Sequence, residues 1–225
     1  MRIEDKTYSN AGNQAVVDLV DADSRRLLDV GCGDGANSRL LRKLRPDLRI
    51  EGITRSPEEA VLAGKTMEKC IVADIESNLP SDLIGGFDVI LFSHVLEHLS
   101  YPEKVVAKML DYLRPGGQII IAVPNVASWR TRWRLMKGDF QYEEFGVFDA
   151  THLRFFTYKT AANYLLAQCG NLETIMTSCD GSVPLWPFRK ILPTELTSFL
   201  DDFGCKHRPN LFGSQILVSA RKVNG

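Results

Sequence analysis

Short apolar runs alternate with helix-like segments over residues 26–125, and this alternation restricts the possible folds more than any other feature of the chain. The apolar runs lie at residues 26–30, 48–54, 69–75, 87–93 and 118–125. The helix-like segments lie at residues 9–22, 37–45, 56–67 and 102–113. Strands and helices in this order predict crossover units and a largely parallel sheet. Because the runs are mostly apolar rather than alternating, we expect helices on both faces of that sheet.

The alternation stops near residue 126. Residues 126–156 are rich in aromatic side chains and follow neither the helical nor the strand period, so we expect an inserted lid or substrate-binding segment there. A helix at 157–170, a strand near 171–178, a short helix near 194–203 and a last strand at 214–222 complete the pattern. The predicted fold is α/β: a Rossmann-like, doubly wound, mostly parallel seven-stranded sheet with helices on both faces.

Three glycines follow the first predicted strand, in the stretch "LLDVGCGDG" at residues 27–35. Glycine permits positive φ and lets the backbone approach a ligand closely, and the helix that follows offers free N–H groups. The spacing is G-x-G-x-G rather than the G-x-G-x-x-G of dinucleotide-binding proteins. Asp29 precedes the glycines, and a carboxylate there suits an ammonium group better than a pyrophosphate. The loop therefore favours a ligand that carries an amino acid moiety.

Composition and net charge limit the kinds of partner that the chain is expected to bind. The chain has 225 residues and a formal net charge of −1, so no global basic field favours nucleic acid or an anionic membrane. No apolar run is long enough to span a bilayer, and the first residues lack the apolar core of a signal peptide, so we expect a cytoplasmic protein without a membrane partner. Five scattered cysteines without a C-x-x-C pair favour reduced thiols over disulfides or structural zinc.

Four motifs occur in a fixed order: "LLDVGCGDG", "VADI", "FDVILFSHVLEHL" and "LRPGGQIIIAVPN". Over about residues 26–125 the chain resembles the class I S-adenosylmethionine-dependent methyltransferases. The segments "GDFQYEEFGVFDATHLRFFT" and "HRPNLFGSQILVSARK" resemble a bacterial branch of these enzymes linked to polysaccharide or small-molecule pathways. The resemblance implies one domain over residues 1–225, with a cofactor-binding half at about 1–125, a lid at about 126–156 and a C-terminal part at about 157–225.

The resemblance also implies S-adenosylmethionine as the cofactor and assigns residues to it. The loop that carries Asp29, Gly31, Cys32 and Gly33 would hold the methionine part. Asp74 would accept a hydrogen bond from the adenine amino group, and Ile75 would pack near the base. Ser93 and His94 would border the sulfonium and the acceptor. The remaining cofactor candidates are Thr54 and Arg55.

Thr54 departs from the family pattern, in which an acidic residue at the end of the second strand binds both ribose hydroxyls. Threonine offers one hydroxyl instead of two carboxylate oxygens. Thr54 together with a backbone group or Arg55 can replace that acid, or cofactor affinity is weakened; we favour the first alternative. Glu51 lies three residues earlier on the same strand and is not expected to substitute.

The stretch "HVLEH" at residues 94–98 matches the H-x-x-E-H pattern of some zinc proteases. It is predicted at a strand end rather than on a helix, so we expect no metal site. Transfer to an oxygen atom requires a base, and histidine is suited to that role near neutral pH. We name His98 and His152 as catalytic candidates, with anchoring of the loop as the alternative role for His98, and expect Glu97 to orient a neighbour.

The segment "WRTRWRLMKG" at residues 129–138 interleaves tryptophans with basic residues. Contact with RNA, an amphipathic helix over the ligand site, and an aromatic face packed on the core are the three alternatives. The overall charge weighs against RNA.

The sequence therefore predicts a methyltransferase for a small-molecule acceptor, with methylation at oxygen. The alternatives are a non-catalytic partner or regulatory subunit that retains the cofactor fold, and an RNA methyltransferase. A homodimer is compatible with the sequence.

Overall fold

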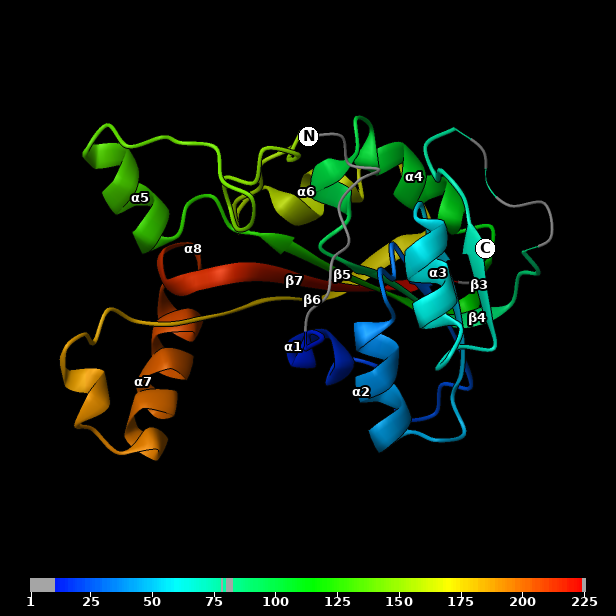
Figure 1. Cartoon of the computed structure of the whole chain (residues 1–225), viewed down its shortest axis with the longest axis horizontal. Coiled ribbons are helices and arrows are strands. Elements are labelled where there is room, and N and C mark those ends of the chain that lie inside the picture. The colour runs from blue at the N-terminus through cyan, green and yellow to red at the C-terminus, as the bar shows by residue number, and fades with distance from the viewer. Residues whose placement is uncertain (1–10, 78, 80–82, 224–225) are drawn as a thin grey trace.

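The protein is described by a computed structural model that covers residues 11–77, 79 and 83–223 (Figure 1). A seven-stranded sheet forms its centre, in the order β3-β2-β1-β4-β5-β7-β6. The strands are β1 (Arg26–Val30), β2 (Arg49–Thr54), β3 (Lys69–Val72), β4 (Phe87–Ser93), β5 (Leu113–Pro124), β6 (Leu172–Gly181) and β7 (Gly213–Lys222). The α-helices are α1 (Gln14–Val17), α2 (Ala36–Leu44), α3 (Pro57–Ala63), α4 (Pro102–Met109), α5 (Trp129–Met136), α6 (Ala161–Leu165), α7 (Thr194–His207) and α8 (Pro209–Phe212). Two short 3₁₀ turns are η2 (Leu96–His98) and η3 (Phe188–Lys190).

The first five strands are parallel, and β7 runs antiparallel to both β5 and β6. The chain first moves outward from β1 to β3 and then returns to place β4 on the other side of β1. Strand order therefore reverses between β1 and β4. Ligands of doubly wound sheets bind beyond the carboxyl ends of the strands at such a reversal, so the fold indicates a site there.

Helices cover both faces of the sheet, as the apolar strands predict. Val16 of α1, Leu41 of α2 and Ala63 of α3 pack into one buried cluster. Val106 of α4 and Leu165 of α6 belong to a second cluster on the opposite face. Figure 1 shows α4 and α6 on one side of the strands and α1 and α2 on the other. The predicted mostly parallel, seven-stranded fold is confirmed.

Several predicted boundaries were wrong. β3 ends at Val72 rather than at residue 75, because the chain turns at Asp74, whose Oδ1 accepts the Glu76 N–H at 3.1 Å. β5 begins at Leu113 rather than at residue 118. Its register with β4 is irregular between Phe87 and Val89, where the "RPGG" residues form part of the strand rather than a turn.

The helix boundaries also differ from the prediction. α1 covers four residues instead of 9–22, of which 9 and 10 lie outside the described residues. α6 covers 161–165 instead of 157–170, and α7 extends to residue 207 instead of 203. α3 and α4 end earlier than the predicted residues 67 and 113. Sequence periodicity located these helices but not their ends, which depend on local turns.

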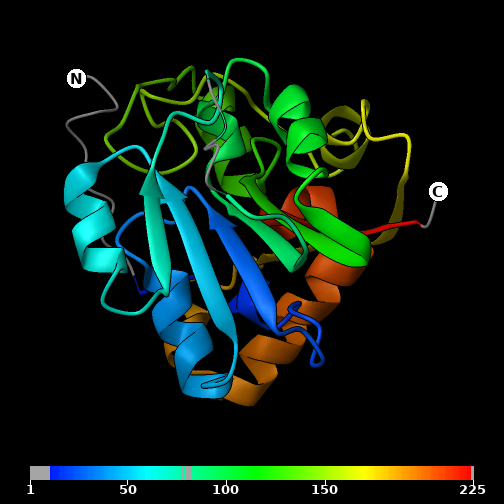
Figure 2. The same ribbon diagram turned by 90° about the vertical axis from the view of Figure 1, so that its right-hand side faces the viewer.

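The segment after β5 contains α5 and a long irregular stretch. In Figure 2, the chain that follows α5 passes beyond the arrowheads of β1, β2 and β3. Leu153 and Arg154 donate their backbone N–H groups to the carbonyl oxygen of Glu97, at 2.8 and 3.0 Å. This irregular segment is thereby fixed to η2, directly after β4. Among the described residues, no helix combines the length and the apolar character that crossing a bilayer requires.

Candidate functional site

A cavity of about 760 Å³ lies at the carboxyl edge of the sheet, within the roughly 300–1,000 Å³ typical of small-molecule sites. The turn after β1, the ends of β2 and β4, η2 and the segment around residues 145–152 form its walls. Ten of the twelve predicted site residues line it: Gly31, Cys32, Gly33, Thr54, Arg55, Ile75, Ser93, His94, His98 and His152. Asp29 and Asp74 are not among the lining residues.

Glycines shape the turn after β1, which lines the cavity. Gly31 and Gly33 adopt positive φ values of 74° and 53°. A Cβ atom at Gly31 would lie 2.4 Å from Cγ2 of Val95, so only glycine fits. The N–H groups of Gly31 and Cys32 both donate to the carbonyl oxygen of Ile53, at 2.8 and 3.0 Å. The turn is therefore held rigidly against β2.

Asp29 lies behind this turn and is completely buried. Neither of its carboxyl oxygens has a hydrogen-bond partner among the described residues. Burial raises the pKa of Asp29 to about 7, and the Asn37 side chain opposes the rise. The acid that lines the cavity in this loop is instead Asp34, whose carboxylate lies 3.0 Å from Nη2 of Arg39.

The end of β2 carries a buried polar pair. Thr54 Oγ1 donates to Glu59 Oε2 at 2.6 Å, and both side chains line the cavity. Ser56 caps α3 by accepting the Glu59 N–H at 3.2 Å. Glu51 lies 3.0 Å from Arg26, outside the cavity lining. The sequence pattern S-x-x-E at 56–59 is that of a capping box, but the Glu59 carboxylate accepts from Thr54.

The next strand end contributes an ion pair at the outer wall. Arg55 Nη2 lies 3.4 Å from Asp74 Oδ2. Burial opposes ionisation of Asp74, but hydrogen bonds from Ser77 and Glu76, together with the charge of Arg55, hold its pKa below the usual value. Ile75, which is buried, presents an apolar surface beside this pair.

At the end of β4, His94 has a left-handed backbone with φ of 55°. Its Nδ1 lies 3.3 Å from Glu97 Oε1, and its Nε2 lies 3.0 Å from Gln215 Oε1. The Gln215 amide nitrogen donates to Asn13 and Asp180, which leaves its oxygen as the acceptor toward His94. Desolvation disfavours the charged ring, but Glu97 and Gln215 raise the pKa of His94 above its usual value. Both ring nitrogens therefore face acceptors, as an imidazolium requires.

Glu97 belongs to η2 and is 1% exposed. Burial favours its neutral form, but the hydrogen bond and charge of His94 and the charge of His98 lower its pKa. Its second oxygen, Oε2, has no partner in the part of the chain that the structure describes. Glu97 is thus a buried carboxylate between two histidines.

His98 is oriented by residues from the irregular segment. Thr151 Oγ1 donates to Asp149 Oδ1 at 2.7 Å and lies 2.9 Å from Nδ1 of His98. Since the hydroxyl proton is used by Asp149, Nδ1 of His98 must donate to Thr151, which assigns the lone pair to Nε2. Burial lowers the pKa of His98, and neighbouring His152 adds to this effect against the opposing charge of Glu97. The arrangement favours a neutral, oriented imidazole.

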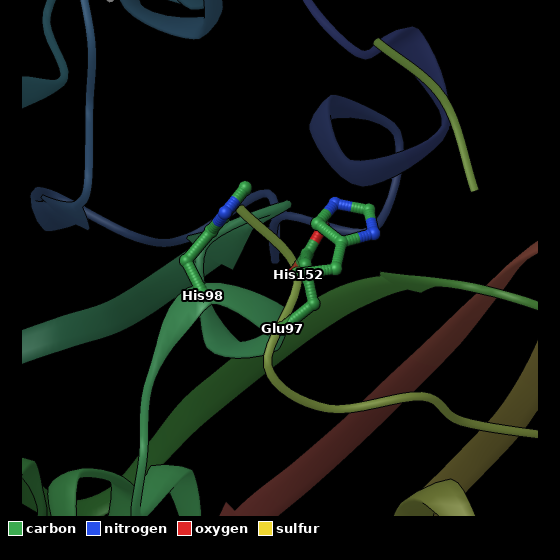
Figure 3. A group of neighbouring side chains, drawn as sticks. All are labelled: Glu97, His98 and His152. Atoms are coloured by element: carbon green, nitrogen blue, oxygen red, sulfur yellow. The ribbon is translucent and has the colours of Figure 1, made fainter. Parts of the chain in front are cut away.

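Figure 3 shows that Glu97 and His98 come from one turn, whereas His152 comes from the segment passing beside it. The two rings lie 4.7 Å apart in an edge-to-face arrangement. His152 Nε2 lies 3.9 Å from Glu97 Oε1, and its Nδ1 lies 3.1 Å from the Val147 carbonyl oxygen. Within the described residues, Glu97, His98 and His152 form the one group whose ligand atoms are close enough, within 4.8 Å, to share a metal ion. "HVLEH" forms a bend directly after β4 and the 3₁₀ turn η2 rather than the helix of the zinc-protease pattern.

Sequence reasoning missed Glu59, Asp149 and Gln215 as cavity residues. The one available signal for Glu59 was its position in the first turn after Thr54. Asp149 and Gln215 lie 51 and 117 residues beyond His98 in the chain, and no spacing rule connects them to it.

α5 neither lines the cavity nor packs both of its tryptophans on the core, and contact with RNA stays a prediction. Trp129 is partly buried, with Nε1 donating to the Ser182 carbonyl oxygen, but Trp133 is 55% exposed and does not pack on the core. Arg134 lies 3.1 Å from Asp139 and 2.7 Å from Glu143, so part of the basic face is neutralised. No residue of α5 lines the cavity.

The doubly wound sheet with an antiparallel seventh strand and a cavity over its carboxyl edge is the architecture of class I methyltransferases. The chain belongs to the methyltransferase domain family, whose sequence profile matches residues 8–168. It is 32% identical over 106 residues to a ubiquinone biosynthesis O-methyltransferase of Nitrosococcus oceani, covering 45% of this chain and 44% of that protein. It is 33% identical over 103 residues to ajmaline N-methyltransferase of Rauvolfia serpentina, covering 43% of this chain and 35% of that protein.

The similarity to a solved structure covers more of this chain than the sequence similarity to the two curated relatives does. The plantazolicin methyltransferase BpumL, in complex with a monoazolic desmethylPZN analog and SAH, superposes with a TM-score of 0.58 at 19% identity. The match covers 93% of this chain and 80% of that one. The chain spans about half or less of the length of the curated relatives it matches, so these relatives define its family rather than its acceptor.

Proposed function

We propose that this protein is an S-adenosylmethionine-dependent methyltransferase that methylates a small-molecule acceptor at oxygen. The observation that carries the proposal is the continuous cavity between the glycine turn after β1 and the histidine group on η2. One side of this cavity offers backbone and carboxylates, and the other offers a neutral, oriented imidazole.

The residues present fit the cofactor. Val95 packs so closely on Gly31 that only glycine fits there, and Gly31, Cys32 and Gly33 all line the cavity. Asp29 lies buried behind this turn, and a bound ammonium group would favour its ionised form. We assign Gly31, Cys32 and Gly33 to the methionine part, Thr54 and Arg55 to the ribose side, and Ile75 to the adenine. Asp74, which pairs with Arg55, would accept from the adenine amino group.

S-Adenosylmethionine supplies, when bound, an electrophilic methyl group on a sulfonium. The protein then has to align the acceptor, exclude water and remove the acceptor's proton. We assign proton removal to His98, whose Nε2 carries the lone pair. Asp149 and Thr151 fix this tautomer, as the third group does in nucleophile–base–orienter arrangements. His152 and the residues 145–149 border the acceptor as a lid.

Two observations support a small acceptor and transfer to oxygen. Phe145, Val147 and His152 line the cavity together with His98, and the volume of about 760 Å³ suits a compact molecule. A neutral imidazole base suits an acidic hydroxyl group, which must lose its proton. The similarity to a ubiquinone biosynthesis O-methyltransferase supports this chemistry.

The alternatives receive less support. The non-catalytic reading depended on the missing acid at Thr54, and Glu59 provides a carboxylate at that place. The RNA reading depended on the basic strip of α5, where Arg134 is paired with two acids.

Thermal unfolding tests the proposal. S-Adenosylhomocysteine at 100 times its dissociation constant stabilises the native state by about 2.7 kcal/mol, which we expect as an upward shift of Tm, whereas NAD⁺ at the same concentration gives none. Transfer of labelled methyl to a panel of small hydroxyl compounds then identifies the acceptor class. No shift with millimolar S-adenosylhomocysteine contradicts the proposal.

A further inference from the structure

The end of β2 contains a polar pair that the family pattern does not predict. Thr54 is 4% exposed and Glu59 is 5% exposed, yet both contribute to the cavity wall. Burying a carboxylate is costly unless it is hydrogen-bonded or meets a ligand. The hydrogen bond from Thr54 meets this requirement for Glu59, and the resulting pair stands at the cavity wall, where it can face a ligand.

Sheet order fixes which part of a ligand meets the pair. β2 lies between β1 and β3, so its end lies between the glycine turn and the Arg55–Asp74 pair. This inference rests on the proposed function: a ligand with its amino acid end at Gly31 and its base at Ile75 places its central sugar over Thr54.

The hydrogen bonds of the pair determine what it can bind. The Thr54 hydroxyl donates its proton to Glu59 Oε2 at 2.6 Å, which leaves Thr54 Oγ1 with lone pairs only. A carboxylate likewise accepts and does not donate. Two acceptors side by side match the two O–H donors of a vicinal diol.

The other acid on β2 is not in a position to take this role. Glu51 lies 3.0 Å from Arg26 and outside the cavity. Glu59, in contrast, is held toward Thr54 because Ser56 caps its N–H at 3.2 Å and fixes the first turn of α3.

We propose that Thr54 and Glu59 act together as the receptor for the ribose diol, with α3 rather than the end of β2 supplying the carboxylate. Glu59 is thus a binding residue of the cofactor site, and Thr54 both orients it and accepts a hydrogen bond. The pair gives the site its preference for a ribose over a deoxyribose.

Calorimetric titration with 5′-deoxy-5′-methylthioadenosine and its 2′-deoxy derivative isolates this contact, because neither probe carries the amino acid part. A hydrogen bond to a charged group corresponds to about a 10- to 100-fold change in affinity. We expect the wild type to prefer the ribose probe by that factor and Glu59→Gln to bring the preference to within about threefold.

Glu58→Gln is the matched control, because Glu58 lies in the same helical turn, is exposed and is outside the cavity. It should keep the wild-type preference. Thr54→Asp combined with Glu59→Gln moves the carboxylate to the end of β2 and should restore the preference, which a purely structural role of Glu59 would not produce. This double variant also decides the question if Glu59→Gln alone fails to fold.

An unchanged ribose preference in Glu59→Gln, or no restoration in the double variant, overturns the inference. Wild-type protein that binds S-adenosylhomocysteine but shows no ribose preference also overturns it, without affecting the proposed function. Wild-type protein that binds neither S-adenosylhomocysteine nor methylthioadenosine overturns the proposed function itself.

Discussion

One wall of the cavity consists of the turn after β1 and the ends of β2 and β3, and the opposite wall consists of η2 and residues 145–152. The first wall contains the turn at residues 31–35, whose shape is set by three positive-φ glycines within five positions of one another. The second is built from side chains of two separate segments, such as His98 and Asp149, which are 51 positions apart, or Glu97 and His152, which are 55 positions apart. With the residue roles proposed above, cofactor binding would depend on backbone shape, whereas acceptor chemistry would depend on tertiary contacts between distant segments.

If the second wall carries the chemistry, His98→Asn should have the largest effect. General base catalysis contributes about 10²- to 10⁴-fold, so we expect kcat to fall by that factor while the affinity for S-adenosylhomocysteine is unchanged. Since burial lowers the pKa of His98 from its ordinary value of 6.5, the acid limb of kcat/KM in the wild type should lie below pH 6.5.

His207→Asn is the control for this variant, since His207 is exposed on α7, away from the cavity. Glu97 Oε1 is hydrogen-bonded to His94, so we expect Glu97 not to hold a catalytic metal ion. EDTA should therefore leave kcat unchanged. Loss of activity in EDTA that added metal restores would instead assign the Glu97 group to a cation.

Burial of Asp29 behind the first wall should make the free energy of unfolding depend on pH. Asp29 has a folded pKa of about 7 against an ordinary 3.8. Between these values the folded state holds the proton and the unfolded state does not, so stability falls as pH rises, by up to about 4 kcal/mol. Asp29→Asn should remove most of this slope in urea unfolding at pH 5 and pH 8.

Asp23→Asn changes an exposed carboxyl group and should keep the wild-type slope. An Asp29→Asn protein whose stability still falls steeply between pH 5 and pH 8 would show that Asp29 ionises normally behind the turn.

Backbone shape in the first wall is tested by Gly31→Ala. An alanine in a left-handed conformation costs about 1–2 kcal/mol, and the collision with Val95 adds about 1–3 kcal/mol. Gly138→Ala is the matched control, because Gly138 has nearly the same φ, 72°, but nothing within 4 Å of the added Cβ. Only Gly31→Ala should also weaken S-adenosylhomocysteine binding; equal effects of both variants would contradict a packed turn.

Thr151→Val should give the smallest effect. It removes the hydroxyl that accepts from His98 Nδ1 and keeps the volume of the side chain. Loss of one hydrogen bond corresponds to about a 10-fold decrease at most, and we expect it in kcat rather than in cofactor affinity. Thr160→Val, at a threonine whose partner Thr157 lies outside the cavity, provides the comparison.

The sheet and the first wall could be predicted from sequence because their signals are local. The apolar run at 26–30 and the glycines after it specify a strand and a turn within ten residues. The departure at Thr54 was visible as well, but its compensation by Glu59 was not, since S-x-x-E predicts a capping box and not a contact to the preceding strand.

The second wall could be predicted only as residue types. His98 and His152 were identified as candidates, but their proximity depends on hydrogen bonds from Leu153 and Arg154 to the Glu97 carbonyl oxygen, which no sequence period encodes. The tautomer of His98 depends on Asp149 in the same way. The predicted end of β3 was wrong for a related reason, because the turn at Asp74 is set by a single side chain.

The separation of the two walls is tested most directly by calorimetric titration of S-adenosylhomocysteine into three proteins under the same conditions. Our account predicts one-to-one binding of equal affinity to the wild type and His98→Asn, and at least about tenfold weaker binding to Gly31→Ala, the effect of about 1.4 kcal/mol. Equal binding to all three, or loss of binding in His98→Asn alone, would contradict it.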